Sequence, residues 1–394
     1  MPALFRETTT VALMEMTMKM MLKKLEEFDL VIMLMAIALT SFGVVMVYSA
    51  SNIMAAKRFN DGFYFLKRQG LFAIVGFAIM LTVMQIDYRF WKKMAVPALL
   101  VCLVLLVMVL IPGIGGRAGG SSRWIKLPGF NLQPSEMAKL ALIMYMAYSL
   151  DKKQDKVKSL GSGFIPYMIV LMVLITCLVL QPDLGGALTL AAVAMTMLFA
   201  AGTRLTYIIS MILLAMPLLA YKLSRGYHKN RIDAFLNPWS DPEGKGFQII
   251  QSWLALGTGG VFGQGLGEGK QKLFYLPEAH TDFILAVIGE ELGFLGVAII
   301  IGMFFLLVQR AMRISVAAPD TFGRFLALGI AVLFGIEATV NMGVVTGLLP
   351  TKGLALPFIS YGGSSLLISL FAVGILLNIS SGLKIEPIKL KEEK

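Results

Sequence analysis

Residues 29–49 read DLVIMLMAIALTSFGVVMVYS, in which a single charge, Asp29, precedes an unbroken run of uncharged and mostly apolar residues. A helix that crosses the hydrocarbon core of a bilayer needs about 20 such residues, so this stretch predicts a transmembrane helix. The same reasoning predicts ten spans, near 29–49, 70–86, 95–112, 136–150, 163–180, 185–201, 205–221, 283–309, 325–349 and 364–383. We therefore expect an all-α polytopic membrane protein with about ten transmembrane helices.

The composition also indicates a membrane protein. The 394 residues are 57% hydrophobic and 15% charged, whereas a soluble domain is about 45–50% apolar and about 25% charged. The net charge of +11 does not indicate nucleic-acid binding, because Lys and Arg occur in short clusters between the apolar runs, where they set topology and meet anionic headgroups. Cys102 and Cys177 lie inside apolar runs and are interpreted as small core side chains, not as a disulfide or a metal pair.

The distribution of positive charge predicts the orientation. Lys and Arg are enriched in the segments that are cytoplasmic if the N-terminus is inside, and this bias favours that orientation. We expect a cytoplasmic tail at 1–28, a membrane domain at 29–383 and a cytoplasmic tail at 384–394. Within the membrane domain, 222–281 is expected to be a long extracytoplasmic loop. Phe247, Ile250 and Leu254 share a helical face in it and predict an interfacial or re-entrant helix.

The residues that can carry chemistry gather in the predicted outer segments. His280 and Asp282 come directly before an apolar run, so the acid either caps a helix or serves as a titratable base at the outer face. The loop 113–135 carries Arg123, Trp124 and Lys126. Glycine occupies seven positions of 257–269, and such a stretch can cradle a pyrophosphate with backbone N–H groups.

Further acidic residues stand at the ends of predicted spans. Asp183 lies at an expected outer hairpin turn, where an Asx turn or a helix cap explains it as well as a functional role does. Glu136 lies in the first turn of a span, which is typical of an ordinary helix start. Both stay candidate substrate-binding residues. Glu337 and Asn341 are four apart on one helix and predict a polar contact between helices.

Taken together, these stretches resemble the SEDS family (shape, elongation, division and sporulation), from the first predicted span to the last. The matching motifs are SRWI at 122–125, QPSE at 133–136, QPDLG at 181–185, GQGLG at 263–267, LPEAHTD at 276–282, GEELG at 289–293, GLLPTKG at 347–353 and SYGGSS at 360–365. Residues 277–282 and 351–354 resemble the FtsW-like division branch more than the RodA-like elongation branch.

The resemblance implies ten spans and a peptidoglycan glycosyltransferase that polymerises lipid II into glycan strands at the outer face of the bacterial cytoplasmic (inner) membrane. It implies action at the division septum, with a class B penicillin-binding transpeptidase and other divisome membrane proteins as partners. The essential acid of the family falls on Asp282.

Such a reaction joins an α-linked donor into a β-1,4 product by one inverting displacement, with undecaprenyl pyrophosphate leaving. It needs a base on the acceptor hydroxyl and positive charge on the pyrophosphate. We expect Asp282 as the base, oriented by His280. The candidate cations for the pyrophosphate are Arg123, Lys126 and Lys352. Trp124 either stacks on a sugar or anchors the chain at the membrane interface.

The sequence leaves the role of Asp282 and the activity itself open in several respects. Asp282 can instead be the ligand of a divalent cation, Mg²⁺ or Mn²⁺, and no organic cofactor is expected. Ten spans with buried acids also suit a lipid II flippase, although its polar groups would line a path through the membrane. An elongation polymerase of the RodA kind and a non-catalytic scaffold for the transpeptidase stay open as well.

Overall fold

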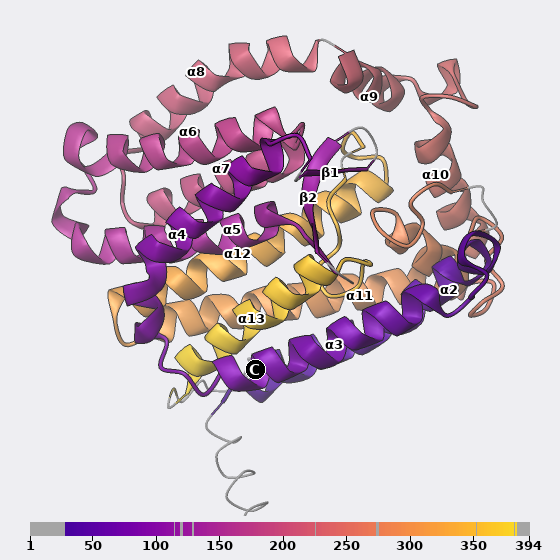
Figure 1. The fold of residues 1–394 in the computed structure, drawn as a ribbon, viewed down its shortest axis with the longest axis horizontal. Coiled ribbons are helices and arrows are strands. Elements are labelled where there is room, and N and C mark those ends of the chain that lie inside the picture. Colours follow the sequence, from indigo (N-terminus) through magenta and orange to yellow (C-terminus); the bar gives the residue numbers. More distant parts are fainter. Residues whose placement is uncertain are drawn as a thin grey trace, which may run out of the picture.

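The computed structural model describes residues 28–113, 115–118, 121–127, 130–224, 226–272, 276–351, 353–381 and 383. The fold is a bundle of long helices with one small sheet (Figure 1). The long helices are α2 (Leu30–Phe59), α3 (Tyr64–Val83), α4 (Arg89–Leu110), α5 (Pro134–Lys152), α6 (Ile165–Leu180), α7 (Leu184–Ala200), α8 (Leu205–Leu223), α11 (Ile284–Ala317), α12 (Thr321–Val345) and α13 (Gly363–Ser380). Each predicted span lies on one of these helices. The predicted tails lie outside the described residues, apart from Phe28.

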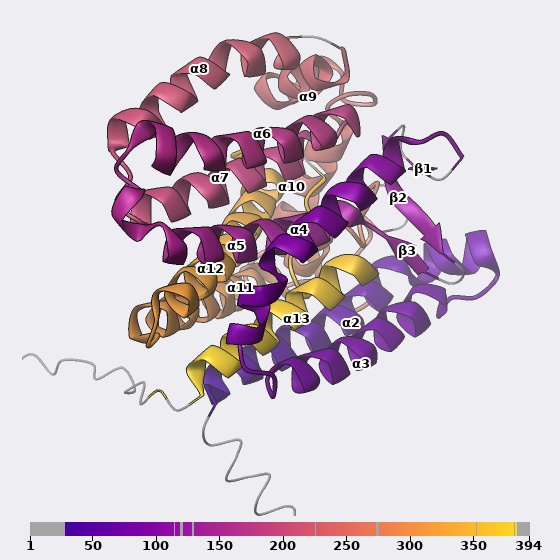
Figure 2. The ribbon, with the colours of Figure 1, turned by 60° about the vertical axis from the view of Figure 1, so that its left-hand side comes forward.

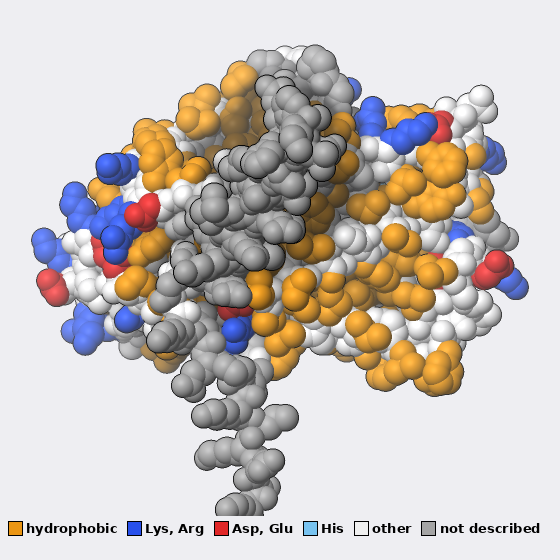
Figure 3. Space-filling view, turned by 90° about the horizontal axis from the view of Figure 1, so that it is seen from below, with side chains coloured by type: hydrophobic (Ala, Val, Ile, Leu, Met, Phe, Trp, Pro, Cys, Tyr) orange, Lys and Arg blue, Asp and Glu red, His pale blue; other side chains and the backbone are white. Residues whose placement is uncertain are grey.

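The bundle has the apolar character that a membrane requires. Among the described residues, eight helical segments are long and apolar enough to cross a bilayer. Helix α7 is shorter, with 17 residues, and α5 is less apolar because charged residues stand near both of its ends. In Figure 3 hydrophobic side chains spread over the face on both sides of the residues drawn in grey, and charged side chains gather mainly toward its left and right ends. The prediction of an all-α polytopic membrane protein is confirmed.

Helix α5 lies at the centre of the bundle, beside α4, α7, α12 and α13 (Figure 2). Its charged residues near the N-terminal end therefore need partners inside the protein. The Lys139 ammonium donates hydrogen bonds to Glu136, at 2.7 Å, and to Glu337 of α12. Glu337 thus makes the contact between helices that its position predicts, through a buried lysine.

The predicted long loop 222–281 contains two further helices, α9 (Gly226–Leu236) and α10 (Phe247–Gly259), joined through a 3₁₀ turn at Pro238–Ser240. They lie at the right-hand end of the bundle in Figure 1. Helix α10 packs on α11, and its buried face includes Ile250 and Ser252. Leu254 is 45% exposed. A helix lies where the sequence predicts one, and Ser252 on its buried side donates to the carbonyl of Val345 at 2.7 Å. Its place at the membrane interface stays a prediction.

A small antiparallel sheet, β1 (Gly115–Ala118), β2 (Ser121–Leu127) and β3 (Phe130–Leu132), packs on α4, α5 and α13, although the sequence predicted only helices and loops. Successive side chains of a strand point to opposite faces. Trp124 and Lys126 therefore share one face of β2, and Arg123 shares the other face with the buried Ile125.

Helix α11 is interrupted at Gly293, whose φ of +66° is a left-handed conformation that favours glycine. The break frees backbone groups that pair with the glycine-rich stretch. Phe294 N donates to Gly260 O at 2.8 Å, and Gln264 N donates to Glu290 O at 2.9 Å. A Cβ at Gly293 would overlap the backbone of this stretch. The glycines of 257–269 therefore serve a close approach to α11.

The backbone N–H groups that could cradle a pyrophosphate bind carboxylates of α11 instead. Gly267 N donates to Glu291 at 3.1 Å, and Lys270 N donates to Glu290 at 2.8 Å. The Lys272 ammonium closes the arrangement, 2.8 Å from Glu291, and both side chains are almost fully buried. The structure therefore does not support the pyrophosphate cradle, since acceptors within the protein already occupy these donors.

Candidate active site

The turn that carries Asp282 is held by its backbone. Three successive carbonyl oxygens accept hydrogen bonds from distant parts of the chain. Tyr361 N donates to His280 O at 2.9 Å, the Ser360 hydroxyl donates to Thr281 O at 2.7 Å, and Asn341 Nδ2 donates to Asp282 O at 2.9 Å. The turn is thus fixed through its backbone carbonyls, from α12 and from the loop before α13.

The Asp282 carboxylate is partly buried and lies against Gly353, where a Cβ would stand 2.9 Å from Oδ2. Burial raises the pKa of Asp282 to about 7, and the charge of Glu278 raises it further, whereas Arg231 and Arg123 lower it. A partly exposed carboxylate with a pKa of about 7 is able to accept a proton from a substrate hydroxyl.

His280 lies in an aromatic cluster. Its ring centroid is 4.6 Å from that of Phe65 and 5.7 Å from that of Tyr361. Burial lowers the pKa of His280, and the charge of Glu278 only partly opposes this. Within the described part of the chain, no hydrogen bond joins His280 to Asp282. The imidazole therefore packs against Phe65 and Tyr361. Backbone hydrogen bonds of the turn, and not the His280 side chain, fix the position of Asp282.

Arg123 and Asp183 lie close together, on the face of β2 opposite to Trp124 and Lys126. Arg123 donates to the carbonyl of Pro182, and its Nη1 lies 3.9 Å from Oδ1 of Asp183. The same Oδ1 accepts from Gly186 N at 3.1 Å and caps α7. Asp183 is 4% exposed. The helix-cap interpretation of Asp183 therefore agrees with the structure, and Arg123 binds the turn that it caps.

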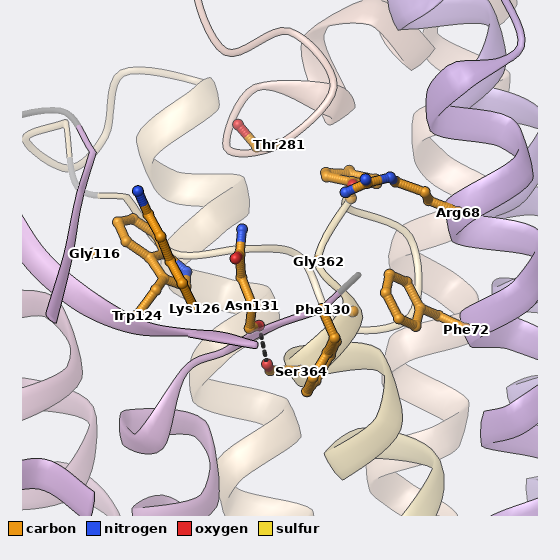
Figure 4. Close-up of a pocket in the computed structure, with 12 residues that line it drawn as sticks. Arg68, Phe72, Gly116, Trp124, Lys126, Phe130, Asn131, Thr281, Gly362 and Ser364 are labelled. Carbon is orange, nitrogen blue, oxygen red and sulfur yellow. Dashed lines mark hydrogen bonds between the residues drawn. The ribbon is translucent and has the colours of Figure 1, made fainter. Parts of the chain in front are cut away.

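A cavity of about 280 Å³ lies between the sheet, α3 and the start of α13 (Figure 4). Trp124 and Lys126 line one side, and Arg68 of α3 lines the opposite side. Thr281, the neighbour of Asp282, also lines the cavity. Its other walls are Phe72, Gly116, Phe130, Asn131 and residues 361–364. The cavity therefore combines two cations with aromatic surfaces and opens beside the Asp282 turn.

Sequence reasoning missed Arg68. The charge itself was visible, because Lys67 and Arg68 stand at a helix end that was predicted to be outside, against the usual bias of positive charge. Positive charge at an outer helix end was thus the sequence feature that could have pointed to Arg68 as a site residue. Arg68 also lies over the ring of Tyr64 at 4.5 Å, which holds its guanidinium at the edge of the cavity.

Two predicted residues remain, Glu136 and Lys352. Glu136 faces Lys139 within the bundle and does not line the cavity. Lys352 lies outside the described residues. The structure thus places Trp124 and Lys126 in the cavity and brings Arg123 and Asp183 together. Asp282 follows Thr281 of the cavity wall and lies within electrostatic reach of Arg123 and Asp183.

A metal ion at this site would need donor side chains close to Asp282. Among the described residues, no group of three or more His, Cys, Asp or Glu side chains is arranged to hold an ion. Mg²⁺ commonly binds through one or two carboxylates together with substrate phosphates and water. Asp282 fits that kind of site only as a single protein ligand completed by substrate oxygens.

The comparisons with known proteins agree with this fold. A model of a family described as "Cell cycle protein", which unites FtsW, RodA and SpoVE, matches residues 29–385. The "Probable peptidoglycan glycosyltransferase FtsW" of Trichlorobacter lovleyi is 70% identical over 372 residues, which cover 94% of this chain and 98% of that protein. "Stage V sporulation protein E" of Bacillus subtilis is 44% identical over 353 residues, 89% of this chain and 96% of that protein.

Solved structures share the architecture. A chain of a peptidoglycan synthase complex, described as coordinating polymerization and crosslinking, has a TM-score of 0.74 at 28% identity and covers 90% of this chain and 97% of that chain. The rod shape determining protein RodA of Thermus thermophilus has a TM-score of 0.67 at 26% identity, covering 91% and 98%. The resemblance to the SEDS family and to its FtsW-like branch is confirmed, and the chain belongs to the FtsW, RodA and SpoVE family of cell cycle proteins.

Proposed function

We propose that the protein is a peptidoglycan glycosyltransferase that polymerises lipid II during cell division, with Asp282 as its general base. The names of close relatives support the activity, since several are called peptidoglycan glycosyltransferase FtsW. The observation that carries the mechanism is a partly exposed carboxylate, with a pKa raised to about 7, next to a cavity that Arg68 and Lys126 line.

The proposed step is a single displacement. Asp282 takes the proton of the acceptor hydroxyl, the hydroxyl oxygen forms a bond with the anomeric carbon of the donor, and the bond from that carbon to the pyrophosphate oxygen breaks. The electron pair leaves with undecaprenyl pyrophosphate, and the configuration inverts. A base with a pKa near 7 combines a useful ionised fraction at neutral pH with enough basicity to accept this proton.

The leaving group needs positive charge on the side away from the base. Arg123 and Arg231 act on Asp282 itself, because both lower its pKa, whereas Arg68 and Lys126 stand in the neighbouring cavity. We therefore assign the pyrophosphate to Arg68 and Lys126. Arg123 stays a candidate for the pyrophosphate as well, although strand alternation turns it away from Lys126. Lys352 and Trp124 stay candidates for donor and sugar binding.

A divalent cation, Mg²⁺ or Mn²⁺, would neutralise the pyrophosphate further if it bound between Asp282 and the substrate oxygens. In that case Asp282 would be its ligand. Whether the carboxylate works as a base or as a ligand is decided by the metal dependence of the reaction.

The cellular setting belongs to the same proposal. The protein would lie in the bacterial inner membrane at the septum, with the cavity facing outward. In this orientation Asp282 has access to lipid II that has been transferred across the bilayer. A class B penicillin-binding transpeptidase and other divisome proteins are the expected partners. The similar chain in a complex that coordinates polymerization and crosslinking supports a transpeptidase partner.

A flippase is the rival function, and the buried ionic group Glu136–Lys139–Glu337 is the observation that favours it, because charge within a bundle often marks a transport path. The test uses purified protein with labelled lipid II in detergent, where no membrane sidedness exists. Glycan strands from the wild type and none from Asp282→Asn support the polymerase. Strands from both variants remove Asp282 from the reaction, and lipid scrambling in liposomes without polymer supports the flippase.

A further inference from the structure

Arg231 connects the long outer segment to the chain beside Asp282. It stands on α9, which packs mainly on α8 and on the 3₁₀ turn at Pro238–Ser240. From there its Nη1 donates a hydrogen bond to the carbonyl of Thr351 at 2.6 Å, a contact between residues 120 positions apart. Arg231 is therefore a polar link between α9 and the loop that precedes α13.

The loop segment that Arg231 holds is the one that touches the carboxylate. Within 351–354, Gly353 lies so close to Asp282 that a Cβ would stand 2.9 Å from Oδ2. Two donors hold this segment in place. Arg231 binds the carbonyl of Thr351, and Asn341 Nδ2 binds the carbonyl of Leu354 at 2.7 Å. A shift at either donor moves the backbone that borders the carboxylate.

We propose that Arg231 is a positioning residue for Asp282, because its hydrogen bond to Thr351 keeps the nearby Gly353 against the carboxylate. The proposal rests on the proposed function, in which Asp282 is the reacting carboxylate. Arg231 needs no contact with substrate for this role. It acts through the loop, and α9 becomes the element whose position is transmitted to the site.

The charges around the carboxylate are consistent with this role. Glu278 in the same turn and Asp183 at the cap of α7 raise the pKa of Asp282, after burial, and Arg231 and Arg123 lower it. From α12, the neutral Asn341 faces the turn. Loss of the Arg231 charge therefore leaves a larger share of Asp282 protonated at neutral pH, whereas a lysine at 231 keeps the charge.

The first experiment measures kcat, KM for lipid II and the pH profile for Arg231→Gln and Arg231→Lys, with Lys229→Gln as the matched control. Lys229 is an exposed cation on the same helix. We expect Arg231→Gln to lower kcat by about 10- to 100-fold, the size that slight misplacement of a reacting group produces. KM should change little, and the acidic limb of the profile should move to higher pH. Arg231→Lys should keep the limb in place, and the control should match the wild type.

A double-mutant cycle provides the second experiment and covers the case in which Arg231→Gln folds poorly. Gly353→Ala forces the same segment away from Asp282, so its effect on kcat should overlap with that of Arg231→Lys. The fold-loss in kcat of the double variant should therefore be smaller than the product of the two single fold-losses. For the control pair, Lys229→Gln with Gly353→Ala, the fold-changes in kcat should multiply. If the fold-losses of Arg231→Lys and Gly353→Ala also multiply in full, the proposal is overturned.

The outcomes separate this inference from the proposed function. No polymer from the wild type, or polymer from Asp282→Asn, contradicts the proposed function. A wild type that polymerises, an inactive Asp282→Asn and an Arg231→Gln with unchanged kcat and pH profile overturn the role of Arg231 alone. A rise in KM with unchanged kcat also overturns it, because Arg231 would then be a substrate ligand.

Discussion

The amide of Asn341 binds the carbonyl of Asp282, with Nδ2 at 2.9 Å from the oxygen, although the two residues are 59 positions apart. The same nitrogen donates to the carbonyl of Leu354 at 2.7 Å. One side chain of α12 therefore joins the turn of the proposed base to the loop that lies against its carboxylate. Asn341 is 1% exposed, so water does not replace either hydrogen bond.

Replacement of Asn341 by Leu should lower both stability and activity. The buried carbonyl of Leu354 and the partly buried carbonyl of Asp282 would lose their donor. A buried group left unsatisfied costs about 1–3 kcal/mol. We expect a lower melting temperature together with a lower kcat. Ser369→Ala of α13 is a matched control, because Ser369 is also buried but stands away from the turn. An Asn341→Leu variant with wild-type kcat would show that the turn keeps its geometry without this contact.

The pH dependence of polymerisation should follow the ionisation of Asp282. Burial, with the charge of Glu278, raises its pKa to about 7, and only the ionised form accepts a proton. Activity should therefore rise with pH through about 7. Arg123→Ala removes a charge that lowers this pKa and should move the rise to higher pH. A profile that is flat from pH 5 to pH 9 would argue against a carboxylate base.

The stability of Asp282→Asn should exclude unfolding as the cause of its inactivity. The folded-state pKa of Asp282 lies above the ordinary value, so the folded chain binds this proton more tightly than the unfolded chain does. The stabilising contribution of the group is present below about pH 4 and is lost as pH rises through about 7. Asp282→Asn should accordingly melt at least as high as the wild type at pH 8. A clearly lower melting temperature there would contradict the assigned environment.

Arg68→Ala should impair use of the donor, because the variant removes one of two cations from the cavity. Loss of one donor to a developing anion typically costs about 10²–10³ in rate, and we expect a fall in kcat/KM that approaches this range. Lys67→Ala is the neighbouring control, since Lys67 is exposed and pairs with Asp61. Equal behaviour of the two variants would remove Arg68 from the site.

Removal of the buried Lys272 should destabilise the protein. Lys272→Met leaves Glu291 unpaired in the interior, and breaking a buried ion pair from one side costs about 3–5 kcal/mol. The melting temperature should fall markedly, and a second change, Glu291→Gln, should recover part of the loss. Lys67→Met, which breaks an exposed pair, should leave it nearly unchanged. Equal melting of both single variants would show that the pairing of the glycine-rich stretch with α11 does not depend on this lysine.

Several site residues could be predicted because their signals are local. Asp282 stands directly before a long apolar run, and Asp183 stands at a short turn between two such runs, so both appear at helix starts in the chain itself. The role of Glu337 as a polar contact was also readable from its position on an apolar helix. Its partner, Lys139, could not be predicted in the same way, because only the packing of α5 on α12 brings the two side chains together.

The sequence by itself determined the membrane class, the number of long helices and the place of Asp282 at a helix start, because the bilayer forces every span into a continuous apolar run whose ends are visible. Only the tertiary structure decided which side chains meet. Arg68 enters the cavity from α3, Arg123 and Lys126 part on opposite faces of β2, and Arg231 reaches Thr351. These choices depend on strand alternation and on contacts between residues distant in the chain, which no local pattern specifies.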